Sequence, residues 1–139
     1  MPLTINLKPR EKLILNGVVI ENSGPMAKIL IHTNAALLRE KDVLPEEKAT
    51  TPARRIYFAI QCQYLFAGKA EMFLASIDRQ LAEYEQTRPE SRELLGEIRH
   101  LLAEDQFYRA LKAAKLLIQH EEEAAAASAA TAGAKPTPA

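Results

Sequence analysis

The sequence predicts an α+β protein in which a small antiparallel β-sheet precedes about four α-helices. Residues 1–50 contain the two-residue alternation of strands and an Asn-Gly turn. From residue 51 onward, apolar side chains instead recur every three or four positions, as on one face of a helix. Residues 124–139 have no large apolar side chain. We therefore expect an antiparallel sheet region at 1–50, a helical region at 51–123 and a disordered Ala-rich tail at 124–139.

The strands are predicted from their alternation and from the turns between them. Residues 3–7 place leucine and isoleucine on one face and polar residues on the other. Asn16-Gly17 lies between two apolar runs, and this dipeptide tolerates the positive φ angles of a type I′ turn. Residues 27–33 form a further strand with Ile29 and Ile31 on one face. Residues 34–44 fit either a short edge strand or a helical turn.

The helices are predicted from four apolar stripes. Thr51 and Pro52 have the residue types of a helix N-cap and a first helical position, and Gly68 is a candidate end. Pro89 separates the second helix from the third. The stripes comprise Ile56, Ile60 and Tyr64; Phe73, Ile77, Leu81 and Tyr84; Leu94, Ile98, Leu101 and Leu102; and Phe107, Leu111, Ala114 and Ile118. The alanines after residue 123 fit either disorder or a few more turns of the last helix.

Composition narrows the function classes. Eighteen basic and eighteen acidic side chains leave no global basic field, although residues 1–55 carry a net charge of +3 and the remainder −3. The single cysteine excludes an internal disulfide and fits a reducing compartment. No signal peptide or membrane-spanning run is evident, so we expect a cytoplasmic protein without membrane contact. The three histidines are far apart in the sequence, and no glycine-rich phosphate-binding loop is present. We therefore expect neither an enzyme nor a bound cofactor.

Two arginines in an unfavourable place indicate a binding site. Arg54 and Arg55 lie in the first turn of the predicted helix, where the helix dipole favours anions. Arg39 and Lys41 lie at the other end of the intervening loop. If the loop brings these cations together, they would bind phosphate, and Tyr57 or Phe58 would stack on a base. The alternative is that Glu46 and Glu47 neutralise Arg54 and Arg55, and that both rings are partly buried.

The blocks "MPLTINLKPREKLILNG", "LLREKDVL", "TTPARRIYFAIQCQYL" and "FYRALKAAKLLI" resemble, in this order, those of the FlbT family of flagellin-mRNA regulators. The resemblance covers roughly residues 1–120. It implies a post-transcriptional repressor that binds the 5′ leader of flagellin mRNA, limits translation and promotes decay of the message. It also implies FlaF and flagellin as candidate partners, and a homodimer is a further expectation.

The N-terminal part alone is similar to the carbon storage regulator family, CsrA. There, Arg39 takes the place of an arginine that contacts RNA, and residues 3–5 take the place of the first RNA-binding strand. This resemblance implies Thr4 as a contact residue. The sequence departs from that family in having leucine before the arginine, and in its large helical addition. The RNA motif and the intertwined dimer are therefore not carried over.

A second hypothesis belongs to another class of function. The four apolar helical stripes and the acidic C-terminal part are typical of a protein-interaction adaptor. In that case the helices would hold FlaF, flagellin or a second copy of the chain, and any effect on RNA would be indirect.

Overall fold

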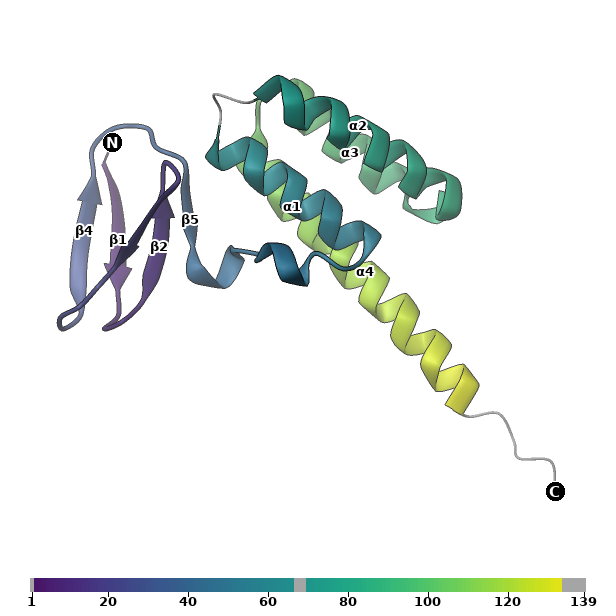
Figure 1. The fold of residues 1–139 in the computed structure, drawn as a ribbon, viewed down its shortest axis with the longest axis horizontal. Coiled ribbons are helices and arrows are strands. Elements are labelled where there is room, and N and C mark those ends of the chain that lie inside the picture. The colour runs from purple at the N-terminus through teal and green to yellow at the C-terminus, as the bar shows by residue number, and fades with distance from the viewer. Residues whose placement is uncertain (1, 67–69, 134–139) are drawn as a thin grey trace.

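The computed structural model describes residues 2–66 and 70–133, and it confirms the α+β class. A β-sheet region lies beside a bundle of helices, and the last helix projects beyond the bundle (Figure 1). The strands are β1 (Leu3–Leu7), β2 (Lys12–Leu15), β3 (Val18–Glu21), β4 (Ala27–Ile31) and β5 (Leu37–Arg39). The helices are α1 (Pro52–Leu65), α2 (Ala70–Thr87), α3 (Arg92–Ala103) and α4 (Phe107–Gly133).

The strands form two antiparallel sheets. One sheet has the order β3-β2-β5 and the other pairs β1 with β4. The turn between β2 and β3 confirms the predicted hairpin: Leu15 is opposite Val18, and Asn16 and Gly17 have φ angles of 51° and 83°. Both values lie in the left-handed region that a type I′ turn requires.

The two sheets share a small apolar core. Ile5 and Leu7 of β1 and Leu13 of β2 are buried between the sheets, with Ile29 and Ile31 of β4 packed against them. Because side chains alternate along a strand, Ile14 and Leu38 point to the other face of the three-stranded sheet. These two residues join the apolar cluster of the helices. The three-stranded sheet therefore has apolar contacts on both faces.

The helices enclose the larger core. Ile56 and Ile60 of α1, Ile77 of α2 and Ile98 of α3 have no exposed surface, as the helical periodicity predicts. α1 and α4 run antiparallel, since the Tyr64 and Tyr108 rings lie 6.0 Å apart while residue 53 contacts residue 121. The break at Pro89 is confirmed by a short 3-10 helix at Pro89–Ser91.

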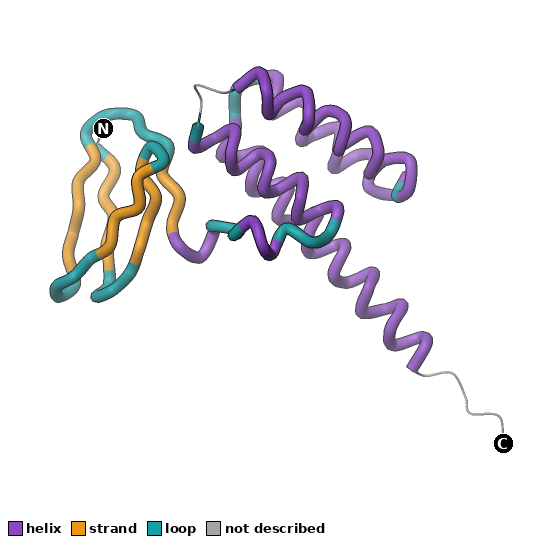
Figure 2. The backbone as a smooth tube through the Cα atoms, in the orientation of Figure 1, coloured by secondary structure: helices purple, strands orange, loops and turns teal. Residues whose placement is uncertain are grey.

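Residues 40–51, which we call the connection, link the sheet to the start of α1. They contain two short 3-10 helices, Glu40–Asp42 and Glu46–Lys48, seen as separate helical turns in Figure 2. The ambiguous segment 34–44 thus contains both a short strand and a helical turn. Tyr64 both accepts a hydrogen bond from Leu37 N and donates one to Leu37 O, and Tyr57 donates to Asp42 O. The connection therefore runs beside α1 in the opposite direction.

The ends of the helices confirm part of the sequence analysis. Thr51 caps α1 through its hydroxyl oxygen, which accepts from Arg54 N at 3.2 Å, and Pro52 is the first helical residue. α4 continues past residue 123 to Gly133, so the expected disordered tail was wrong for residues 124–133, where the alanines extend the helix as in the other alternative. The predicted stop at Gly68 and residues 134–139 lie outside the described residues. Among the described residues, no helix combines the length and apolarity that crossing a bilayer needs.

Candidate functional site

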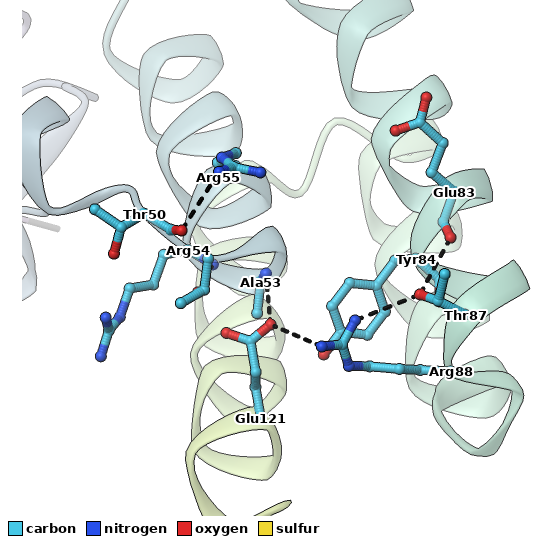
Figure 3. A network of polar contacts seen from close by, with 10 residues as sticks. Thr50, Ala53, Arg54, Arg55, Glu83, Tyr84, Thr87, Arg88 and Glu121 are labelled. Carbon is cyan, nitrogen blue, oxygen red and sulfur yellow. Dashed lines mark hydrogen bonds and ion pairs between the residues drawn. The ribbon is translucent and has the colours of Figure 1, made fainter. Parts of the chain in front are cut away.

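The N-terminus of α1 holds an anion that belongs to the chain itself. The Glu121 carboxylate of α4 accepts a hydrogen bond from Ala53 N at 3.1 Å, as Figure 3 shows. Its side chain is only 10% exposed, and Arg88 lies 3.9 Å from the same oxygen. The guanidinium of Arg88 also lies over the Tyr84 ring, 4.8 Å from its centre. A carboxylate at a free helical N–H is favourable for the same reason as a bound phosphate.

The two arginines that follow also find partners within the chain. Arg54 lies 3.5 Å from Glu122, again on α4, and Arg55 donates a long hydrogen bond of 3.4 Å to Thr50 O. Glu46 and Glu47 are in none of the ion pairs found among the described residues, so the expected neutralising partners were wrong. In Figure 3 the Arg54 and Arg55 side chains extend to different sides of α1. They do not form one guanidinium cluster.

Arg39 lies apart from both of them. Leu37, two residues before Arg39, is held by Tyr64, which is ten residues beyond Arg54 on α1. At about 1.5 Å per residue, this separation along the helix is roughly 15 Å. The connection thus keeps its two ends apart, and the expectation that it gathers them was wrong.

Arg39 ties the two sheets together. Its Nη2 donates to Asn6 O of β1 at 2.8 Å and to Glu11 Oε2 at 2.7 Å. Glu11 in turn accepts from Lys8 N at 2.9 Å. The Lys8 N–H and, next, the Arg39 guanidinium lower the pKa of Glu11 because both stabilise the charged carboxylate. Arg39 is therefore engaged with protein oxygens, and its RNA contact stays a prediction.

The predicted stacking role of Tyr57 is corrected by its burial. The ring is 5% exposed, and its hydroxyl donates to Asp42 O at 2.5 Å. Burial, and then the charge of Asp42, raises the pKa of this phenol, so it stays a neutral donor. A base cannot stack on a ring that is already covered. Phe58, the other candidate, is half-buried.

Lys41 and Thr4 are both exposed but lie on different parts of the fold. Lys41 lines a depression of about 300 Å³ between the connection, α1 and α4. Beside it, Lys115 Nζ lies 3.1 Å from the buried Asp42 carboxylate. Thr4 lies on β1, where strand alternation turns it away from Ile5 and the core. Lys41 and Tyr57 line the same depression, but the structure does not gather the six predicted site residues into one cluster.

A different surface emerges around Thr4. Pairing of β1 with β4 sets Thr4 opposite Leu30 and Asn6 opposite Lys28, and all four side chains are exposed. We call these four residues the outer β1–β4 face. The sequence analysis did not single out Lys28 or Asn6, although the alternation of Lys28 and Leu30 with Ile29 and Ile31 is the signal that locates them.

The sheet region, residues 1–39, carries a net positive charge when the chain is divided at the end of β5. Residues 1–39 contain five cationic and two acidic side chains, a net charge of +3. One acid, Glu11, is engaged by Arg39, and the other, Glu21, lies 3.8–3.9 Å from Lys12 and Arg10. Lys8 and Lys28 take part in no ion pair found among the described residues. Residues 40–133 carry −4, so the excess positive charge lies with the sheets.

Neither metal binding nor thiol chemistry is indicated by the described residues. Residues 2–66 and 70–133 contain no group of three or more His, Cys, Asp or Glu that could hold a metal ion. Cys62 is half-buried, and burial followed by the charge of Glu46 raises its thiol pKa, which disfavours the reactive thiolate.

Comparison with known proteins identifies the family. The family model described as "Flagellar protein FlbT" matches residues 3–125. A "Flagellum biosynthesis repressor protein FlbT" from Caulobacter vibrioides (strain ATCC 19089 / CIP 103742 / CB 15) is 34% identical over 126 residues, covering 88% of this chain and 89% of the relative. A "Probable flagellum biosynthesis repressor protein FlbT" from Rhodopseudomonas palustris (strain TIE-1) is 36% identical, covering 88% and 97%. No solved structure matches the chain. The chain belongs to the FlbT family of flagellar proteins.

Proposed function

We propose that this chain represses flagellin synthesis after transcription, by binding the 5′ untranslated region of flagellin mRNA, limiting its translation and promoting its degradation. The names of the relatives support a repressor of flagellum biosynthesis. The observation that carries the RNA contact is the positive charge of residues 1–39 beside the exposed outer β1–β4 face. We therefore place the proposed RNA site on the sheets and not around the connection.

The outer β1–β4 face has the chemistry that an RNA strand needs. Lys28, with Lys8 at the end of β1, supplies cations for phosphates. Thr4 and Asn6 supply hydrogen-bonding groups, and Leu30, at 51% exposure, supplies an apolar contact. Arg39 acts indirectly, by holding β1 through Asn6 O.

A mobility-shift titration with flagellin leader RNA at two salt concentrations tests this proposal. The variant Lys8→Ala/Lys28→Ala is expected to weaken binding and to flatten the salt dependence by about 0.7 in log–log slope for each phosphate that it no longer neutralises. Arg109→Ala, an exposed cation on α4, is the matched control and should bind like the wild type. Equal binding by both variants would remove the sheet face from the site.

An adaptor function is the second candidate. Tyr108 and Leu116 are exposed apolar side chains on α4, at 43% and 47%, and they are eight residues apart on one helix. This surface favours a protein partner such as FlaF, flagellin or a second copy of the chain. If the wild-type chain retains FlaF or flagellin in a purified binding assay but never shifts leader RNA, the adaptor function replaces the RNA function.

A further inference from the structure

A cavity between α1 and α2 combines an aromatic ring, a cation and an orphaned amide. It has a volume of about 410 Å³, within the ~300–1,000 Å³ typical of small-molecule sites. The described residues that give it chemical character are Glu46, Arg55, Phe58, Cys62, Ser76 and Gln80. Arg55 and Phe58 are three residues apart on α1, and Ser76 and Gln80 are four apart on α2, so each helix presents two of them on one face.

The amide of Gln80 is incompletely satisfied. Its Nε2 donates to Ser76 Oγ at 3.3 Å, whereas its Oε1 is buried and has no hydrogen-bond partner among the described residues. A buried acceptor without a donor costs free energy, and a ligand with an N–H group would recover it. The Glu46 carboxylate, at the same cavity, is in no ion pair among the described residues and is a second acceptor.

Arg55 supplies the opposite charge. It is exposed, and its guanidinium donates only the long 3.4 Å hydrogen bond to Thr50 O within the described part of the chain. Unlike Arg54, it faces no carboxylate within ion-pair distance among the described residues. A guanidinium in this state is available to bind a phosphate through two parallel hydrogen bonds.

We propose that this cavity binds one nucleotide, with its base beside Phe58 and its phosphate at Arg55. A base is planar and stacks on an aromatic side chain, and its edge carries N–H donors for the acceptors of Glu46 and Gln80. Guanine is the best fit, because its imino and amino N–H groups are adjacent on one edge. An aliphatic ligand would leave both acceptors unmatched. The proposal rests on the proposed RNA function for the source of the nucleotide, although a free nucleotide has the same chemistry.

An NMR titration of the ¹⁵N-labelled full chain with guanosine 5′-monophosphate tests the cavity directly. Ribose 5-phosphate is the control ligand, since it keeps the phosphate and lacks the base. We expect the nucleotide to shift backbone amides within residues 46–62 and 76–80, and ribose 5-phosphate to bind at least tenfold more weakly. Equal affinity for the two ligands, or no response within these residues, would overturn the proposal.

Two substitutions assign the contacts. Arg55→Ala should weaken nucleotide binding about tenfold because the phosphate no longer meets a guanidinium, whereas Arg109→Ala should leave binding unchanged. Gln80→Leu should also weaken binding, yet should leave the folded chain at least as stable, because it removes an orphaned acceptor. Wild-type affinity in both cavity variants would contradict the assignment.

The same variants, used with leader RNA, separate this inference from the proposed function. If RNA binding depends on Lys8 and Lys28 but not on Arg55 and Gln80, and the nucleotide does not bind, the RNA function survives and the cavity proposal fails. If the nucleotide binds at the cavity and leader RNA does not bind at all, the cavity proposal survives and the RNA function fails.

Discussion

The sheets, residues 3–39, and the helices, residues 52–133, use charge in different ways. In the helices, cations and acids meet: Glu121 with Arg88, Glu122 with Arg54, and Glu85 with Arg99 at 2.9 Å. In the sheets, the acids are too few to match the cations, so Lys8 and Lys28 remain outside any ion pair among the described residues. Ion pairs within the helices stabilise the fold. A lysine that has no acidic partner on an exposed face is instead free to bind an anion from outside the chain.

The two regions also differ in the size of their cores. The described sheet core has three buried members, Ile5, Leu7 and Leu13, whereas the helical core draws on all four helices and on Leu38 of β5. Because apolar burial is the main favourable term in folding, the helices should supply most of the stability. The sheets would then serve mainly to display a binding face.

The largest predicted effect breaks the helical core. Ile60→Ala should lower the free energy of unfolding by about 2–5 kcal/mol, since Ile60 has no exposed surface and the substitution leaves a cavity. Ile29→Ala, the matched change in the sheets, should cost less because Ile29 is only partly buried. Urea unfolding of both variants measures the difference. An equal or larger loss for Ile29→Ala would reverse the comparison.

The second effect concerns the internal anion at α1. Glu121→Gln should lower the free energy of unfolding by about 1–2 kcal/mol, because it removes the charge that faces the helix N-terminus and Arg88. Chemical denaturation measures this loss against Glu123→Gln, an exposed neighbour on α4, which should change the value by less than about 0.5 kcal/mol. Indistinguishable stabilities would show that this carboxylate does not hold α1.

The third effect appears at alkaline pH. Burial raises the pKa of Tyr57 above its ordinary value of 10.0, so its contribution to stability is complete below pH 10 and is lost as the pH rises further. Tyr57→Phe should therefore be less stable than wild type at neutral pH, because Asp42 O loses its donor, and should lose less on going from about pH 9 to pH 11. Parallel curves of stability against pH would contradict the burial of this phenol.

The smallest effect lies in the sheets and at acid pH. The pKa of Glu11 is lowered below its ordinary value of 4.5, so its contribution is present above pH 4.5 and is lost as the pH falls through the lower, folded value. Glu11→Gln and Arg39→Ala should each make the free energy of unfolding fall less steeply with decreasing pH. The change in slope should correspond to less than one proton taken up on unfolding. An acid limb that is unchanged in both variants would show that this pair does not contribute.

The fold was predictable to the extent that it depends on local patterns. The Asn16-Gly17 hairpin, the Thr51 cap and the break at Pro89 each follow from the conformational preferences of one or two residues. The stripes of α1 to α4 follow from the requirement to bury one face. How the five strands divide into two sheets, and which face of β2 meets the helices, depends on long-range pairing that periodicity does not encode.

The candidate site was less predictable, because ion-pair partners come from distant positions. The cations at the start of α1 correctly indicated an anion there, yet the anions are Glu122, which pairs with Arg54, and Glu121, which caps Ala53 N. Both are almost seventy residues away, on a helix that runs antiparallel to α1. Nearness in sequence suggested Glu46 and Glu47 instead. Likewise, Tyr57 and Phe58 are adjacent, and only the packing of the connection on α1 determines that Tyr57 is the buried one.

The most direct test of the central claim, that the outer β1–β4 face receives the RNA backbone, is NMR mapping of leader RNA on the full ¹⁵N-labelled chain. We predict that amides of β1 and β4, including those of residues 4, 6 and 28, shift on binding and return toward their free positions as salt is raised. Unchanged signals in β1 and β4, together with shifts confined to the helices, would contradict it.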